Sequence, residues 1–118
     1  MERKTILIAD DDPVILKLLE HDLMAAGYAV VQAQDGQAAV RLARQRQPDL
    51  VILDIMMPEM DGGDAGQALK DRLSTCNIPI VFLSSLVTAS VDRQGEHPLL
   101  AKPYRHADLL QVVREQTT

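Results

Sequence analysis

Polar side chains follow four short apolar runs in this chain. They are three consecutive aspartates, one further aspartate, a pair of serines, and a lysine before a proline: Asp10, Asp11, Asp12, Asp54, Ser84, Ser85 and Lys102-Pro103. If the runs are parallel strands, their carboxyl ends share one edge of a sheet and these side chains converge there. Carboxylates a few ångströms apart repel by roughly 1 to 4 kcal/mol per pair, so such a group needs a cation or a shared proton.

Magnesium is the cation that suits this group of residues. It prefers oxygen ligands, keeps several waters and commonly bridges one or two carboxylates to a substrate phosphate. A phosphoryl group would then be held by the metal on one side and by Lys102 and Ser84 on the other. An ionised aspartate is also a competent phosphoryl acceptor. The residues therefore predict a site for magnesium-dependent phosphoryl chemistry.

The apolar runs alternate with segments of helical period, which is the pattern of a parallel α/β sheet. Three runs, Ile6–Ala9, Leu50–Leu53 and Ile80–Leu83, are apolar at every position, as expected for central strands covered by helices on both faces. Weaker runs at Tyr28–Val31 and Leu99–Ala101 are expected nearer the sheet edges. Five β/α units with right-handed crossovers predict a doubly wound α/β fold.

Apolar residues at helical spacing predict four clear helices. Their expected apolar faces are Ile15, Leu18, Leu19 and Leu23, then Ala39, Leu42 and Ala43, then Ala65, Ala68, Leu69 and Leu73, and finally Leu109, Val112 and Val113. Asp12-Pro13 predicts a helix start and Ala26-Gly27 a helix stop, while Asp35-Gly36 and Asp61-Gly62 mark two further starts. Residues 86–93 are expected to form a short, weak fourth helix.

Length, charge and cysteine content restrict the class of protein. The 118 residues, 47% of them hydrophobic, suit one globular domain covering 1–118. The net charge of −5 disfavours direct nucleic-acid binding, because binding to a phosphate backbone requires a basic face. The single cysteine, Cys76, is expected to be a buried thiol, and the histidines to lie apart on the surface. With neither a signal peptide nor a long apolar run in this sequence, we expect a cytoplasmic protein without a membrane partner.

Several of these segments together resemble the receiver domain of two-component response regulators of the chemotaxis-regulator type. They are the acidic run after Ile6–Ala9, DLVILDIMMPEMDG at 49–62, IPIVFLS at 78–84, and Lys102-Pro103. The resemblance covers nearly the whole chain in the same order. It implies a flavodoxin-like sheet of five parallel strands in the order 2-1-3-4-5.

The resemblance also implies a metal site. Asp10 and Asp11 would be its acidic pair, with Asp11 touching magnesium directly and Asp10 mainly through water. Asp54 and the backbone carbonyl of Met56 would be the other protein ligands.

The same resemblance implies the signalling chemistry. Asp54 would accept a phosphoryl group from a sensor histidine kinase or a phosphotransfer protein, Ser84 would be the switch hydroxyl, and Lys102 the cation that pairs with the phosphoryl group. The Lys102-Pro103 bond would be cis. The domain would be a regulatory phospho-acceptor rather than an enzyme, and its change of conformation would regulate a downstream output protein or domain.

Two other functions compete with this one. A flavin-binding protein of the same fold is disfavoured, because a mononucleotide site needs hydroxyls and glycines after the first strand, where this chain has three aspartates. A divergent receiver that acts as a phosphorylation-independent interaction module remains an alternative. Leu99 stands where the family often has an aromatic residue, so we expect phosphorylation to order or shift residues 86–98. We also expect Lys102 to matter more for phosphoryl transfer than for folding.

Overall fold

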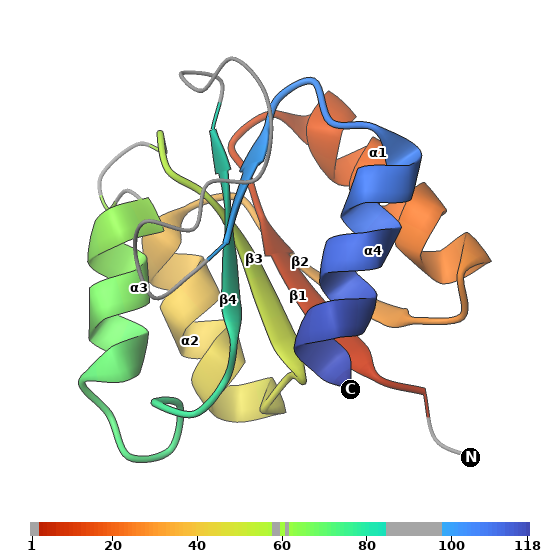
Figure 1. The fold of residues 1–118 in the computed structure, drawn as a ribbon. Helices are drawn as coiled ribbons and strands as arrows, with labels where there is room; N and C mark the ends of the chain where they lie inside the picture. Colours follow the sequence, from red (N-terminus) through yellow and green to blue (C-terminus); the bar gives the residue numbers. More distant parts are fainter. Residues whose placement is uncertain (1–2, 58–59, 61, 85–97) are drawn as a thin grey trace.

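A single parallel sheet organises the computed structural model, which describes residues 3–57, 60, 62–84 and 98–118 (Figure 1). Its five strands lie in the order β2-β1-β3-β4-β5. They are β1 (Thr5–Ala9), β2 (Ala29–Ala33), β3 (Leu50–Asp54), β4 (Ile80–Ser84) and β5 (Leu99–Ala101). The predicted strand order is therefore confirmed, and the two weaker apolar runs form the edge strands.

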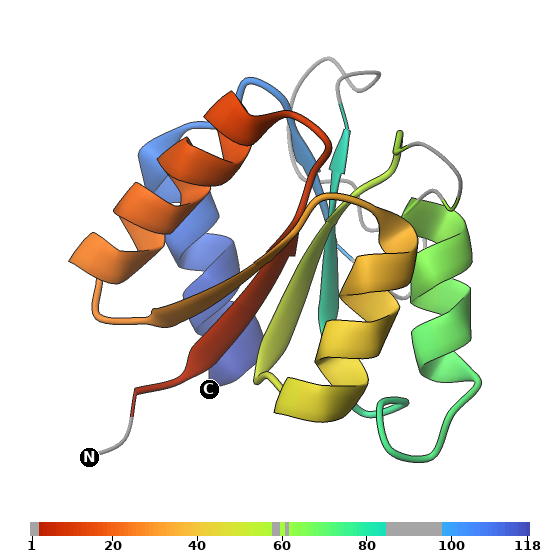
Figure 2. The same cartoon turned by 180° about the vertical axis from the view of Figure 1, so that it is seen from behind.

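Four described helices cover the sheet, namely α1 (Pro13–Ala25), α2 (Gly36–Arg46), α3 (Gly62–Lys70) and α4 (His106–Thr117). Helices α1 and α4 lie on one face of the sheet, and α2 and α3 lie on the other, as both views show (Figures 1 and 2). The doubly wound, flavodoxin-like class is thus confirmed. The short helix expected at 86–93 falls outside the described residues. None of the described helices is long and apolar enough to cross a membrane.

The helix ends follow the predicted signals. Asp12 accepts a hydrogen bond from the Val14 amide at 2.9 Å, and Pro13 is the first residue of α1. Asp35 likewise accepts from the Ala38 amide at 2.8 Å at the start of α2. Gly27 follows α1 with φ of 98°, a left-handed conformation that favours glycine. These caps fix where α1 and α2 begin, next to the ends of β1 and β2.

Two predicted apolar positions were wrong. Leu18 is 50% exposed, because α1 turns Leu16, Leu19 and Leu23 toward the core instead. Leu73 is 96% exposed, because α3 ends at Lys70 and the residue lies beyond the helix.

The predicted environment of one sulfur-containing side chain also needs correction. Cys76 is partly exposed rather than buried, and its Sγ lies 3.6 Å from the Leu73 carbonyl oxygen. Met56, whose apolar side chain would ordinarily favour burial, is 58% exposed. Met57, in contrast, is buried in the apolar cluster on the α2 and α3 face.

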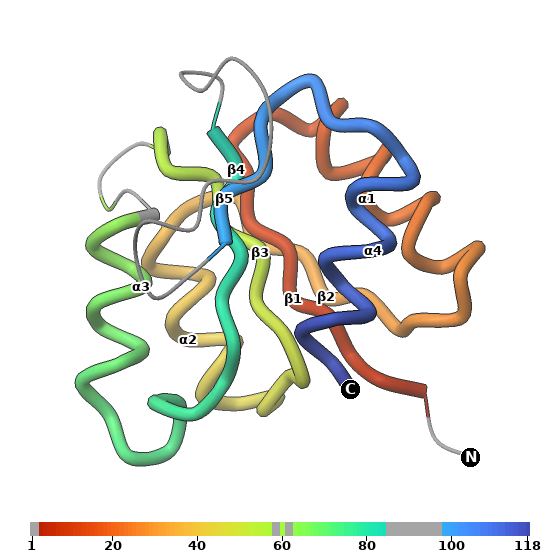
Figure 3. The backbone as a smooth tube through the Cα atoms, viewed as in Figure 1, coloured from red at the N-terminus to blue at the C-terminus, as the bar shows by residue number. Residues whose placement is uncertain are grey.

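The carboxyl ends of the strands meet at the upper edge of the sheet as drawn in Figure 3. Asp54 pairs with Leu83 in the ladder between β3 and β4, and Ser84 pairs with Ala101 between β4 and β5. The Lys102 amide then donates to the Ser84 carbonyl at 2.8 Å. The sheet itself therefore brings Asp54, Ser84 and Lys102 to one edge.

Candidate functional site

One cation contacts two buried carboxylates at this edge. Lys102 Nζ lies 2.6 Å from Asp10 Oδ2 and 3.2 Å from Asp54 Oδ2. Asp10 follows β1 and is 0% exposed, and Asp54 ends β3 and is 4% exposed. The side chain of Lys102 is itself only 15% exposed. Because the three groups are withdrawn from water, they need protein partners, and the two ion pairs supply part of these contacts.

Asp10 is held by several hydrogen bonds. Its Oδ1 accepts from the Asp12 amide at 2.9 Å, and its Oδ2 accepts from Lys102. Its own amide donates to the Ala33 carbonyl at 3.2 Å, which ties it to the end of β2. Both carboxylate oxygens of Asp10 thus have protein partners already.

Asp11 completes an acidic cluster that could hold a metal ion. One carboxylate oxygen from each of Asp10, Asp11 and Asp54 lies within 4.8 Å of those from the other two. Asp11 is exposed, whereas Asp10 and Asp54 are buried. When all three are ionised, three negative charges face the single positive charge of Lys102, and a net charge of −2 remains. Oxygen donors with this excess of negative charge are what magnesium binds in proteins.

The site changes the acid–base behaviour of its residues. Burial raises the pKa of Asp54 above its ordinary value of 3.8, and the negative charge of Asp10 raises it further. Lys102 opposes this rise, as does the Met56 amide, which lies 3.4 Å from Asp54 Oδ1. Burial by itself would lower the pKa of Lys102, but the hydrogen bonds and charges of Asp10 and Asp54 raise it overall. Lys102 is therefore an ammonium at neutral pH.

The structure brings most of the predicted site residues to one place. Asp10, Asp11, Asp54 and Lys102 form the cluster, and the Met56 amide contacts Asp54. Ser84 is 2% exposed at the end of β4, beside the strand that leads to Lys102. The Lys102-Pro103 peptide bond is cis, as the family resemblance implied. Ser85 lies outside the described residues.

Asp22, Tyr104 and His106 form a second polar group near Lys102, which was not predicted from the sequence. Tyr104 Oη donates to Asp22 Oδ2 at 3.2 Å, and His106 Nδ1 lies 3.3 Å from Asp22 Oδ1. His106 is exposed as expected, but it is paired with Asp22. Burial, followed by the charge of Asp22, raises the pKa of Tyr104. Residues of this group also line a hollow of about 240 Å³ that reaches Lys102.

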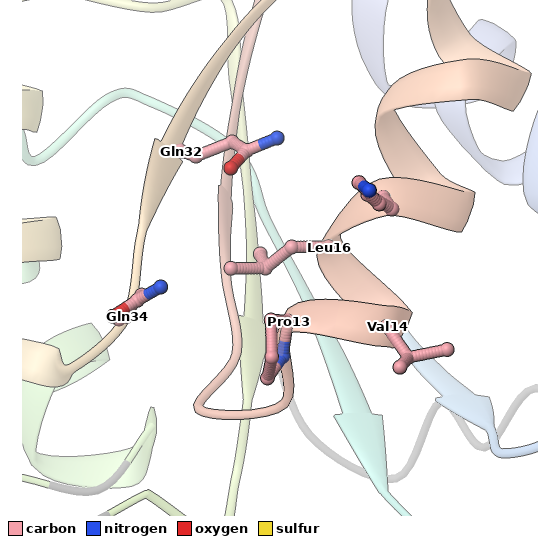
Figure 4. Close-up of a pocket in the computed structure, with 6 residues that line it drawn as sticks. Pro13, Val14, Leu16, Gln32 and Gln34 are labelled. Carbon is pink, nitrogen blue, oxygen red and sulfur yellow. The ribbon is translucent and has the colours of Figure 1, made fainter.

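A separate pocket of about 300 Å³ lies between α1 and the end of β2 (Figure 4). Leu16 points from α1 toward the sheet, and Gln32 and Gln34 border the opposite side. Its lining combines aliphatic and amide groups with Lys17, and the lining residues that the structure describes include no carboxylate to hold a metal ion. The acidic cluster is therefore the better candidate for the functional site.

Comparison with known proteins identifies the family of this chain. The family model for the response regulator receiver domain matches residues 6–114. The DNA-binding dual master transcriptional regulator RpaA of Synechocystis is 41% identical over 113 residues, covering 92% of this chain and 47% of RpaA. The chain thus spans about half the length of this relative.

Solved structures of receiver domains share the fold of this chain. The receiver domain of the Francisella response regulator 1452 superposes with a TM-score of 0.85 at 26% identity, covering 98% of this chain and 97% of that one. The receiver domain of sensor histidine kinase PA1611 from Pseudomonas aeruginosa has a TM-score of 0.83 at 27% identity and 98% coverage of both chains. It is described with a magnesium ion coordinated in its active-site cleft. With the family model matched over residues 6–114, this chain belongs to the response regulator receiver domains of two-component signalling.

Proposed function

We propose that this chain is a phosphorelay domain in which Asp54 accepts a phosphoryl group in a magnesium-dependent reaction. The observation that carries the proposal is the position of Asp54, which is buried at the end of β3, close to the Asp10 carboxylate and 3.2 Å from Lys102 Nζ. Receiver domains are regulatory domains that histidine kinases phosphorylate, which gives the general class of reaction. We assign the receiver domain to residues 1–118.

The metal would be held by Asp10, Asp11, Asp54 and the backbone carbonyl of Met56. Asp11 is the exposed member of the cluster and would contact the ion directly. Asp10 would act mainly through water, because its two oxygens already accept bonds from the Asp12 amide and Lys102. When bound, magnesium supplies positive charge that offsets the phosphoryl oxygens as they approach the carboxylates.

The residues of this chain would have distinct parts in the transfer. A carboxylate oxygen of Asp54 attacks the phosphorus of a phosphohistidine, and the P–N bond to the donor imidazole breaks as the new O–P bond forms. The electron pair of the broken bond stays on the departing nitrogen, and the donor ring leaves as neutral imidazole because its other nitrogen already carries a proton. Lys102 pairs with a phosphoryl oxygen, and the Ser84 hydroxyl donates to another. Since Asp54 is itself modified, the domain acts as a regulatory acceptor.

The proposed partners follow from this chemistry. A sensor histidine kinase or a phosphotransfer protein would supply the phosphoryl group in the cytoplasm, and an output protein or domain would read the change. RpaA is named as DNA-binding and is about twice as long as this chain. Because this chain carries a net charge of −5, we assign any DNA contact to an output partner rather than to the receiver. The expected response of residues 86–98 stays a prediction.

Labelling with a small phosphodonor tests the proposal. With acetyl phosphate and magnesium, intact-mass measurement should show one added phosphoryl group, and peptide mapping should place it on Asp54. Asp54→Asn should abolish labelling, whereas Asp71→Asn, a change at an exposed aspartate after α3, should leave it intact. Phosphate found on another residue would overturn the assignment. Magnesium binding without any labelling would favour the phosphorylation-independent interaction module.

A further inference from the structure

Gly36, the first residue of α2, packs against the backbone of Met60. A Cβ atom placed on Gly36 would come within 2.9 Å of both the carbonyl carbon and the Cβ of Met60, and closer still to the carbonyl oxygen. Cβ contacts under 3.0 Å essentially never occur in real structures, so one partner would have to move. The atoms that oppose it belong mainly to the main chain, which cannot rotate away as the end of a side chain can. Only glycine fits here without displacing the main chain around Met60.

Met60 belongs to the connection between β3 and α3, which begins at the functional site. Asp54 and Met56 stand at the start of this connection, and the Met56 amide already contacts the Asp54 carboxylate. Met57 is buried in the apolar cluster on the α2 and α3 face, and Met60 packs against the same cluster. The described part of the connection is therefore held at β3, at Met57 and at the contact with Gly36.

The start of α2 is itself fixed relative to the acidic cluster. The Asp35 cap, which accepts from the Ala38 amide, sets the position of the first turn of α2. Three residues before Gly36, the Ala33 carbonyl accepts a hydrogen bond from the Asp10 amide. A change at the contact between Gly36 and Met60 would thus move Met60, four residues after Met56 in the same connection, relative to the strand ends carrying Asp10.

We propose that Gly36 is a positioning residue for the magnesium site, because its lack of a side chain sets where the connection lies and so where the Met56 carbonyl points. This inference rests on the proposed function, in which that carbonyl is a metal ligand. Gly66 in α3 offers a contrast, since a Cβ there would meet the end of the Phe82 ring at 3.0 Å. Both glycines are closely packed, but only Gly36 opposes main chain.

Magnesium affinity, measured by calorimetry on the full chain, tests the proposal. Gly36→Ala should bind magnesium about 10-fold more weakly, the size of effect seen when the support of a metal ligand is removed. The matched control Gly66→Ala should leave the affinity within about 2-fold, as expected for a change that leaves the ligands and their supports in place. Met60→Ala should also retain its affinity for magnesium, because the main-chain contact between Met60 and Gly36 remains.

The outcomes separate the inference from the function on which it rests. If the wild type binds magnesium and Gly36→Ala binds it equally well, Gly36 does not position the site and the function stands. Equal losses in Gly36→Ala and Met60→Ala would assign the effect to side-chain packing and overturn the inference. A wild type that does not bind magnesium would defeat the proposed function itself.

A measurement on the native protein covers the case in which Gly36→Ala does not fold. In a nuclear magnetic resonance titration with magnesium, the amide signals of Gly36 and Met60 should shift together with that of Met56, whereas Gly66 should stay in place. A shift confined to the acidic residues and Met56 would overturn the inference.

Discussion

Ile8 in β1 and Asp10 just after it are both 0% exposed, yet burial has opposite consequences for them. Burying an isoleucine side chain stabilises the fold by about 1.5 to 3 kcal/mol. Burying a carboxylate costs free energy that partners must offset, and here these are the Asp12 amide and Lys102. The middle of the sheet therefore provides the stability that allows its edge to hold charged groups close together. Substitutions in the two regions should affect stability in different ways.

The largest effect is expected in the middle of the fold. Leu19 in α1 is fully buried against the sheet, so Leu19→Ala should lower the free energy of unfolding by about 4 kcal/mol through lost transfer energy and a residual cavity. Urea unfolding with and without magnesium measures this loss. It should be nearly the same in both conditions, and a loss that magnesium largely restores would break the distinction between core and edge.

Lys102→Ala should lower stability by about 3 kcal/mol without magnesium, because it leaves two buried carboxylates facing each other without their cation. This geometry changes the expectation from the sequence, which placed Lys102 at the rim with little part in folding. Added magnesium should restore part of the loss, since it supplies positive charge to the same carboxylates. An unchanged thermal midpoint in metal-free buffer would show that the ion pairs are energetically neutral.

Asp54→Asn should raise stability without magnesium by about 1.5 kcal/mol at neutral pH, since it removes a buried negative charge beside Asp10. Because the pKa of Asp54 in the folded state lies above 3.8, the folded protein retains its proton to higher pH than the unfolded chain does. Relative to the variant, the wild type loses stability as pH rises above about 4 and through the folded pKa. Between pH 3 and 7, the thermal midpoints of the wild type and Asp54→Asn should converge at the acidic end. A difference that stays constant with pH would show that the ionisation of Asp54 is not the cause.

Tyr104→Phe should have the smallest effect, a loss of about 0.5 to 1 kcal/mol. The change removes the hydrogen bond to Asp22, but Asp22 still has His106 nearby and is partly exposed. Tyr104 is thus intermediate between the apolar core and the charged edge of the sheet, because water can partly replace its hydrogen bond. Chemical unfolding at neutral pH measures the difference, and a loss as large as that of Lys102→Ala would place Tyr104 with the buried edge.

Much of the fold and of the candidate site was predictable from local signals in the sequence. Asp10 follows the apolar run of β1, Asp54 ends that of β3, and Lys102 follows β5, so the alternating α/β pattern predicts that these residues share one edge of the sheet. The strand order itself came from the family resemblance. The contact of Gly36 with Met60 and that of Asp22 with Tyr104 had no such signal. They depend on how separate elements approach one another, which residue spacing along one element does not encode. The same reason explains the error at Leu18, since the rotation of α1 is set by its neighbours.

The ion pair between Asp10 and Lys102 joins residues 92 positions apart, which affects when the site can exist. During synthesis the aspartates emerge from the ribosome well before Lys102 does. Until β5 pairs with β4, Asp54 lacks the cation beside it. Under the proposed function, competence for phosphorylation would be a late event in folding, because contacts between distant residues close slowly. A brief pulse of phosphodonor during refolding should then label only the molecules whose last strand has joined the sheet.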